Sequence, residues 1–349
     1  MNLDDLEYFK SIDSQNMINE IDNLPGQLET TWQNSQAYSL PELDTISQVI
    51  ISGMGGSAIG ADMLAAYVYS ICKVPIYIHR NYGLPAWVNK DVLVISVSHS
   101  GNTEETLSSF NEALKKDAPI VAITTGGKLE EAALNTKSIV WKFEHKGQPR
   151  AAVGFSFTLL LSLMTRLGLI PDQSDYIRAA ANSMRIYQDK LKADVPVQEN
   201  PAKRMARQAV GQWVTVIGAD HFAPIARRWK TQINEIAKAW AQFEYLPEAD
   251  HNTLAGVVNY GPNLLKTMVL FLKGKWEHER NSLRVDLTSK EFMIAGINTE
   301  VLKFEYEHPL IEMWNSLLFG DYMAYYLAMS YGIDPTPVDA IENLKKAMK

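Results

Sequence analysis

The first half of the chain alternates between short apolar runs and segments whose apolar residues recur every three or four positions. The apolar run at residues 48–52 ends in a glycine-rich loop, and a helical pattern begins directly after it at Ala58. Strands and helices continue to alternate, with strands expected at 74–80, 91–98, 119–125 and 138–143 and helices at 103–117 and 128–136. This alternation predicts a parallel sheet with helices on both faces.

The second half repeats this order after a proline-interrupted connector. Its expected elements are helices at 151–168 and 176–193, the connector with Pro196 and Pro201, a strand at 213–220, a helix at 222–240 and a strand at 263–274. We infer two copies of one fold, but only the first copy has the glycine-rich and serine-rich loops. The predicted fold class is α/β, with two doubly wound parallel-sheet subdomains and flanking helices.

Helical spacing also marks both ends of the chain. Residues 1–36 are expected to form helix, and the apolar pattern at 310–332 precedes a last helix that ends at Lys349. A chain of 349 residues is long enough for two hydrophobic cores. The predicted domains are an N-terminal helical segment at 1–36, a first subdomain at 37–155 and a second subdomain with the C-terminal helices at 156–349.

Composition and charge narrow the class of partner. The formal net charge of −7 and the lack of a Lys/Arg-rich run argue against a nucleic-acid partner. No uninterrupted apolar stretch reaches the length of about 18 residues that a membrane-spanning helix needs, and the acidic N-terminus does not resemble a secretory signal. The single cysteine, Cys72, cannot form an internal disulfide. These features predict a cytoplasmic protein, and if its substrate is a phosphate ester, local donors must hold it against an unfavourable overall charge.

The loop after the first strand, GMGGSA at residues 53–58, fits the G-x-G-x-x-A pattern of dinucleotide-binding proteins. An NAD site also needs an acidic residue at the end of the next strand, which reads IYIHR and has none. An NADP site that uses Arg80 is an open alternative. By itself, this loop is weak evidence for a nicotinamide cofactor.

A second loop, SHSGNT at residues 98–103, lies between a strand and a helix and carries three hydroxyl groups. Helix N-termini offer unpaired N–H groups and a partial positive charge, and Ser and Thr hydroxyls add donors within short reach. This combination suits a phosphate monoester and needs no lysine. Helix capping is the alternative interpretation, which Glu104 and Glu105 in the first turn would support, but capping alone requires only one such residue.

GMGGSAIG and SHSGNTEET, in this order on successive strand–loop–helix units, resemble the sugar isomerase (SIS) domain. Over nearly the whole chain, the sequence is also similar to the bifunctional phosphoglucose/phosphomannose isomerases. The further matching segments are QPRAA at 148–152, NEIAK at 234–238, PEADHN at 247–252 and IENLK at 341–345. The resemblance implies two SIS-type subdomains and reversible isomerisation of glucose 6-phosphate and mannose 6-phosphate with fructose 6-phosphate.

The resemblance also implies roles for individual residues. Substrate-binding roles fall on the two loops, at Gly55, Gly56, Ser57, Ser98, Ser100 and Thr103. Catalytic roles fall on Glu235 as the base, on Arg150 near the reacting carbons, and on His251 and Lys345 in ring opening. The chain departs from the usual family residues at His99, Ala58 and Ile236. Related isomerases take the histidine from the neighbouring subunit, which implies a homodimer with shared active sites.

These residue types suit the chemistry. A carboxylate such as Glu235 is ionised at pH 7 and can move a proton between C2 and C1 through a cis-enediolate. Histidine can donate or accept a proton near neutral pH, whereas arginine can only stabilise charge. The reaction requires neither a metal nor a nicotinamide cofactor, and the scattered histidines show no metal-ligand spacing. From the residues alone, a salt-bridged Glu235 and a Lys345 that only stabilises a helix C-terminus are open alternatives.

Two other functions fit the same scaffold. An amino-sugar phosphate enzyme would need an ammonia source or a Schiff-base lysine near the sugar. A non-catalytic sugar-phosphate sensor would keep the binding loops but would not depend on acid–base groups. For an isomerase of dual specificity, Thr336 is a candidate for the small residue that leaves room to protonate either face of the enediolate.

Overall fold

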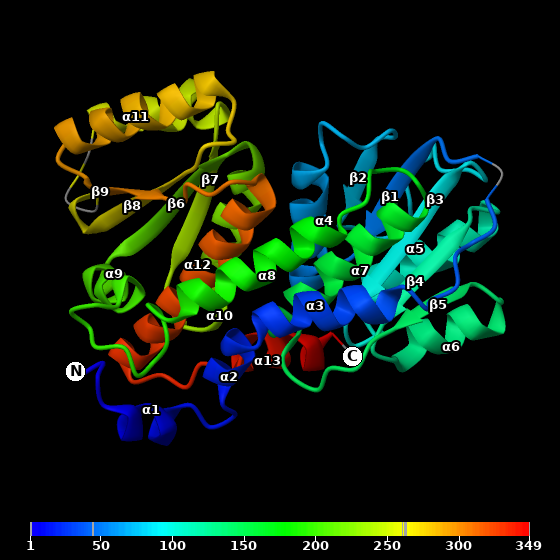
Figure 1. The fold of residues 1–349 in the computed structure, drawn as a ribbon, viewed down its shortest axis with the longest axis horizontal. Coiled ribbons are helices and arrows are strands. Elements are labelled where there is room, and N and C mark those ends of the chain that lie inside the picture. The colour runs from blue at the N-terminus through cyan, green and yellow to red at the C-terminus, as the bar shows by residue number, and fades with distance from the viewer. Residues whose placement is uncertain (1, 44, 260, 262–263, 349) are drawn as a thin grey trace. The chain divides into compact units, whose positions relative to one another are not determined.

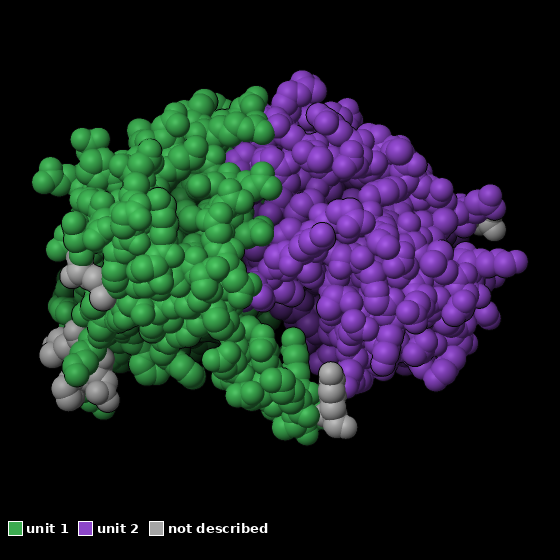
Figure 2. Space-filling model, turned by 90° about the horizontal axis from the view of Figure 1, so that it is seen from below, with its two compact units in different colours: residues 1–23, 182–349 green, residues 24–181 purple. Residues whose placement is uncertain are grey.

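The computed structural model describes residues 2–43, 45–259, 261 and 264–348 (Figure 1). These residues form two compact units, shown in different colours in Figure 2. Unit 2 is the continuous stretch 24–181, and unit 1 combines residues 1–23 with residues 182–349. Each unit contains one parallel sheet, as predicted.

The sheet of unit 2 has the strand order β2-β1-β3-β4-β5, and every pair of neighbours is parallel. Its strands are β1 (Gln48–Ser52), β2 (Ile76–His79), β3 (Val92–Ser98), β4 (Ile120–Thr124) and β5 (Ile139–Lys142). In the register, Ile51 pairs with Ile78 on one side and with Ile95 on the other. All seven residues of β3 are buried, as expected for a central strand covered on both faces.

Helices cover both faces of this sheet. They are α3 (Leu24–Ser35), α4 (Gly55–Tyr67), α5 (Glu104–Lys115), α6 (Gly127–Asn135) and α7 (Val153–Arg166). On α5, Thr106, Phe110 and Ala113 recur at helical spacing and are buried, so this face packs on the sheet. Helix α7 is apolar on nearly all sides because it lies between α4 and α3. Its Ser162 accepts a hydrogen bond from Ser35 of α3 at 2.7 Å.

The sheet of unit 1 has the order β7-β6-β8-β9 and is also parallel throughout. Its strands are β6 (Trp213–Ala219), β7 (Ala241–Leu246), β8 (Thr267–Lys273) and β9 (Asn298–Lys303). This order repeats the β2-β1-β3-β4 part of unit 2, which confirms the predicted duplication of one doubly wound fold.

The helices of unit 1 lie on both faces of its sheet, with α11 on one face and α10 with α12 on the other (Figure 1). Their bounds are α8 (Ser174–Gln188), α9 (Pro201–Ala209), α10 (Ala223–Glu235), α11 (Glu279–Ile294), α12 (Pro309–Tyr331) and α13 (Asp339–Ala347). The boundary between the units falls within α8. Buried Arg228 on α10 pairs with Asp321 on α12 at 2.7 Å. Over the described residues, no helix is long and apolar enough to cross a membrane.

Several predicted elements need correction. The segment 1–36 is not one helix but three, α1 (Leu6–Ile12), α2 (Met17–Asp22) and α3, because Asp13 ends the first and its carboxylate accepts the N–H groups of Met17 and Ile18 at 2.7 and 3.0 Å. Helix α10 ends at Glu235 rather than near 240. Of the predicted last helix, α13 is described to Ala347, and Lys349 lies outside the described residues.

Candidate functional site

The candidate phosphate-binding loops lie side by side at the carboxyl edge of the unit 2 sheet. The chain leaves β1 through α4 and returns in β2, whereas it leaves β3 through α5 and returns in β4. Because β2 and β4 lie on opposite sides of the β1–β3 pair, the strand order reverses at this pair. Ligands of doubly wound proteins bind at such a switch point, outside the carboxyl ends of the strands.

Glycines at the start of α4 allow another backbone segment to approach it closely. Gly55 has φ +51°, a left-handed conformation that favours glycine. A Cβ atom on Gly56 would lie 2.6 Å from the carbonyl oxygen of Pro149, so only glycine lets the first turn of α4 meet the segment at 149–151. Ser57 follows and is buried. Within the described residues, the N-cap residue Met54 makes no side-chain capping bond, which leaves this helix start to other acceptors.

The loop from β3 to α5 supplies the hydroxyl groups. The Oγ atoms of Ser98 and Thr103 lie 2.9 Å apart, and Ser100 between them is exposed. Thr103 is the N-cap of α5, yet its side chain caps no N–H group of that helix in the described part of the chain. The capping alternative for Thr103 is therefore not what the geometry shows, and its hydroxyl instead meets that of Ser98 at the start of the helix.

A third loop, from β4 to α6, holds the serine-rich loop in place. Gly101 has φ +64°, and a Cβ atom there would lie 1.7 Å from the carbonyl oxygen of Gly126. The N–H and hydroxyl of Thr125 both donate to the carbonyl of His99, at 3.2 and 2.7 Å. The sequence prediction did not use this loop, although the TTGG run at 124–127 directly after a predicted strand was a usable signal.

Arg150 lies in the same unit as these loops. It is the central residue of a short 3₁₀ helix, Pro149–Ala151, and only 3% of it is exposed. Its Cα lies 3.4 Å from the position of a Cβ on Gly56, so its backbone touches the first turn of α4. The structure thus brings Arg150, as a buried residue, to the edge of the candidate phosphate loops.

Glu235 lies in unit 1 as the last residue of α10 and is partly buried. The ammonium group of Lys238 donates to the carbonyl of Glu235 at 2.9 Å and to the carbonyl of Asp334 at 2.9 Å. The carboxylate of Asp334 accepts the N–H of Thr336, which is buried. Lys238 therefore joins the candidate base to the segment that carries Thr336, a link that the sequence did not reveal.

His251 ends a short 3₁₀ helix, Glu248–His251, and is exposed. The neighbouring Asp250 carboxylate accepts from Arg284 and from Thr288 on α11, both at 2.7 Å. The backbone that carries His251 is thus anchored to a helix while the imidazole faces outward. Lys345 lies on α13, where every described residue from 339 to 348 is exposed.

The predicted site residues fall into two sets by unit. Unit 2 holds Arg150 and all the substrate-binding residues, which the structure brings together. Unit 1 holds Glu235, His251 and Lys345, which lie on three separate elements. Of the family departures, Ala58 and Ile236 are buried in helix packing. In the described ranges, no three His, Cys, Asp or Glu residues are grouped as metal ligands.

Arg80, the residue on which the NADP alternative depends, is already bound by other residues of unit 2. Its guanidinium pairs with the Asp62 carboxylate of α4 and donates to the carbonyl of Ala58 at 3.1 Å. An ion pair with a carboxylate opposes recruitment of the same guanidinium by a ribose phosphate. The geometry therefore does not favour the NADP interpretation.

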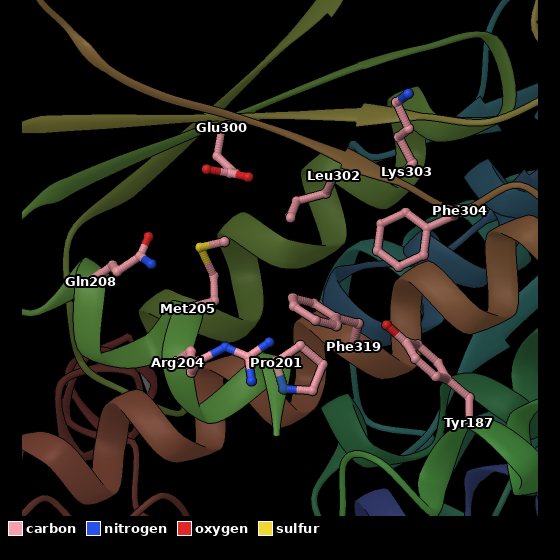
Figure 3. A pocket seen from close by; sticks show the side chains of 10 residues that line it. All are labelled: Tyr187, Pro201, Arg204, Met205, Gln208, Glu300, Leu302, Lys303, Phe304 and Phe319. Atoms are coloured by element: carbon pink, nitrogen blue, oxygen red, sulfur yellow. The ribbon is translucent and has the colours of Figure 1, made fainter. Parts of the chain in front are cut away.

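Unit 1 also contains a cavity of about 260 Å³ that includes none of the predicted site residues. One wall is the face of α9 with Arg204 and Met205, and another is the edge strand β9 with Leu302 (Figure 3). The rings of Phe304 and Phe319 meet edge to face at 5.8 Å on its floor. Its apolar floor does not resemble the hydroxyl-lined loops of unit 2.

Buried carboxylates occupy the carboxyl edge of the unit 1 sheet. Glu312 accepts the N–H of Lys275 at 2.7 Å and contacts His221 at 2.9 Å, and both Glu312 and His221 are buried. The carboxylate of Glu277 accepts the N–H of Gly274 at 3.1 Å. Burial raises the pKa of Glu277 to about 7, and Asp220 and Glu312 act in the same direction.

Comparison with known proteins places these two units in a family. Residues 42–165 match the SIS domain, and residues 198–348 match the bacterial phospho-glucose isomerase C-terminal SIS domain. A bifunctional phosphoglucose/phosphomannose isomerase of Caldicellulosiruptor bescii is 36% identical over 95% of this chain and 98% of its own length. One from Aquifex aeolicus is 33% identical over 88% of this chain and 92% of its own length.

The fold has counterparts among solved structures. A hypothetical protein of Thermus thermophilus superposes with a TM-score of 0.75 at 15% sequence identity, covering 96% of this chain and 90% of that protein. At this level of identity the similarity concerns the fold alone.

Proposed function

The chain belongs to the bifunctional phosphoglucose/phosphomannose isomerases and is an isomerase, that is, an intramolecular oxidoreductase; we propose that it interconverts glucose 6-phosphate and mannose 6-phosphate with fructose 6-phosphate through a cis-enediolate. The observation that carries this proposal is the pair of adjacent helix starts at the switch point of unit 2. Neither α4 nor α5 has a side-chain cap within the described residues, and the hydroxyl groups of Ser98 and Thr103 meet at the start of the second of them.

The phosphate is held by these loops. With a net charge of −7, the protein has no global field that attracts an anion, so the backbone N–H groups and the hydroxyls must supply the binding energy. Ser57, Ser98, Ser100 and Thr103 act as donors, and Gly55 and Gly56 allow the backbone to approach. The phosphate fixes one end of the sugar, which leaves the C1–C2 end to the catalytic groups.

Glu235 moves the proton. Its carboxylate takes the proton from C2 of the open-chain aldose, and the C–H electrons form the C1–C2 double bond while charge develops on the oxygen at C1. The same carboxyl group returns the proton to C1, and the proton of the C2 hydroxyl passes to the oxygen at C1, so that C1 carries a hydroxyl group and C2 becomes the ketone. Glucose and mannose phosphates differ only at C2, so one enediolate that is protonated on either face gives both aldoses.

Other groups assist this step. Arg150 carries a permanent positive charge and stabilises the enediolate oxygens. His251 and Lys345 open the sugar ring, and Thr336 leaves the space that protonation of either face requires. The proposal includes a homodimer in which His251 serves the partner subunit's site, and a cytoplasmic enzyme of sugar-phosphate metabolism that acts without a cofactor.

The test uses purified protein and fructose 6-phosphate in D₂O with EDTA, followed by NMR. The expected result is formation of both aldose phosphates with deuterium at C2. The Glu235→Gln variant should lose about 10²- to 10⁴-fold in kcat while it still binds fructose 6-phosphate, because only the proton-transfer group is changed.

Glu291→Gln, an exposed position on α11, is the matched control and should keep full activity. Saturable binding without turnover in the unmodified protein would favour the sensor and contradict the proposal. Full activity of Glu235→Gln would remove Glu235 from the mechanism while leaving the reaction itself in place.

A further inference from the structure

Two histidines meet beside the phosphate loops. The Nε2 atom of His99 lies 2.8 Å from the Nδ1 atom of His145. His99 belongs to the β3–α5 loop, directly after Ser98. His145 belongs to the segment between β5 and the 3₁₀ helix that contains Arg150. The pair therefore joins the loop that carries the hydroxyls to the segment that leads into Arg150.

Aromatic rings hold both imidazoles in place. His99 packs edge to face on Phe143 at 5.9 Å, and His145 packs on Phe155 at 5.4 Å. Phe143 and Phe155 stack on each other at 5.2 Å. Phe155 lies on α7, two residues into the helix that follows the segment of Arg150. The four rings form one group in which each imidazole packs against a phenyl ring.

The backbone on each side of the pair is also fixed. The carbonyl of His99 accepts both the N–H and the hydroxyl of Thr125. After His145, the N–H of Ala151 donates to the carbonyl of Gln148 at 2.8 Å, and the Gln27 amide donates to the carbonyl of Ala151 at 2.8 Å. The histidine pair thus connects the serine-rich loop to the segment that leads into Arg150, and each of these segments has further hydrogen bonds near the pair.

We infer that the His99–His145 hydrogen bond is a positioning link that sets the distance between the phosphate-binding loop and Arg150. The link rests on the proposed function, since it matters only if Arg150 acts at the C1–C2 end of the sugar. The phosphate anchors one end of a six-carbon chain and Arg150 meets the other. If the distance between the phosphate site and Arg150 is wrong, the negative charge that develops on the enediolate oxygens lies too far from the guanidinium. The phosphate itself stays bound.

Such an error affects the rate more than the binding of phosphate. A displacement of about 1 Å in a group that positions a substrate can cost about 100-fold in rate. The hydroxyls of Ser98 and Thr103 are held by other contacts than the histidine pair, because these two side chains meet each other and Gly101 rests on Gly126. The binding of inorganic phosphate should therefore not depend on the link.

The experiment compares His145→Phe, which keeps a ring against Phe155 but removes the nitrogen, with His145→Asn, whose amide nitrogen or oxygen can take the place of Nδ1. For His145→Phe, kcat with fructose 6-phosphate should fall by about 10- to 100-fold. The inhibition constant of inorganic phosphate, used as the probe of the phosphate loop, should not change. His145→Asn should recover most of the lost kcat.

Phe110→Leu is the control for core packing, because Phe110 is a buried ring of the same unit that belongs to the core cluster of α5 and the sheet and not to the histidine group. It should lower the melting temperature and leave kcat as it is. Wild-type kcat in His145→Phe would overturn the inference, and so would an equal loss in Phe110→Leu or a parallel loss of phosphate binding. If the unmodified protein itself gives no aldose phosphate, the proposed function fails instead, which keeps the two failures distinct.

Discussion

The two parallel sheets share one strand order, yet the loops at their carboxyl edges have opposite properties. In unit 2, α4 and α5 begin without side-chain caps in the described chain, at loops of glycine and hydroxyl residues. In unit 1, the corresponding loops are filled by carboxyl groups of the protein itself. Asp220 accepts the N–H of His278 at 2.8 Å, and His278 in turn caps α11.

The backbone donors of the unit 1 loops are satisfied in the same way at two more places. Glu277 accepts from Gly274, and Glu312 accepts from Lys275. A carboxylate that takes up backbone N–H groups leaves no donor for a substrate phosphate at that position. The same strand order therefore carries different groups at equivalent loops: carboxyl groups of the protein itself in unit 1, and glycine and hydroxyl residues in unit 2.

The largest effect is expected when Glu312, whose carboxylate fills the loop after β8 in unit 1, is replaced. Glu312→Ala removes the buried partner of His221 and of the Lys275 N–H, and we expect a loss of about 3–5 kcal/mol in the free energy of unfolding. Urea unfolding measures the loss. If the carboxylate does substitute for an external anion, added formate should raise the melting temperature of this variant more than that of the unmodified protein. Equal responses to formate would contradict the comparison.

A second effect concerns pH. Because the pKa of Glu277 rises from 4.5 in the unfolded chain to about 7 in the folded one, the folded state holds a proton that the unfolded state releases between these values. The stability contributed by this proton is present below pH 4.5 and is lost as the pH rises through 7. Relative to Glu277→Gln, the unmodified protein should lose roughly 3 kcal/mol between pH 5 and pH 8. Parallel curves for the two proteins would show that Glu277 titrates normally.

The third prediction concerns the serine-rich loop of unit 2 and expects a loss of about 100-fold in kcat/KM. Gly101→Ala places a methyl group against the carbonyl of Gly126 at a left-handed φ of +64°, so the serine-rich loop must move. Gly83→Ala is the control, since Gly83 has φ +62° but no atom within 4 Å of the added Cβ. Steady-state kinetics should show the loss only for the first variant. A comparable loss for Gly83→Ala would attribute the effect to backbone strain in general.

The same contrast explains what could be predicted from the sequence. The unit 2 loops consist of residues that are consecutive in the chain, and their glycines and serines directly follow strongly apolar strands. The doubly wound fold and the position of the loops could therefore be inferred from local patterns. Family membership, which the relatives confirm, follows from the same motifs.

The features that were missed depend on distant contacts or on weak patterns. Strand β7 is only six residues long and follows α10 closely, and β9 at the sheet edge has mostly exposed or half-buried polar residues. Glu312 meets His221 from 91 residues away, and His145 meets His99 from 46 residues away. No local sequence pattern predicts contacts between residues so far apart in the chain. The catalytic roles of Glu235, His251 and Lys345 remain predictions.

Unit 1 combines two distant parts of the chain, which affects the order in which its surfaces are buried during synthesis. The ring of Phe9 packs on Tyr325, and the hydroxyl of Tyr322 donates to Asp22 across 300 residues of sequence. At about 5–20 residues per second, a ribosome needs roughly 15–60 s to bridge that interval. During this time the whole of residues 24–181 emerges, while the apolar sides of α1 and α2 have no partner yet. Helices α1 and α2 are thus made long before their partners on α12, and their apolar sides are among the last surfaces of unit 1 to be buried.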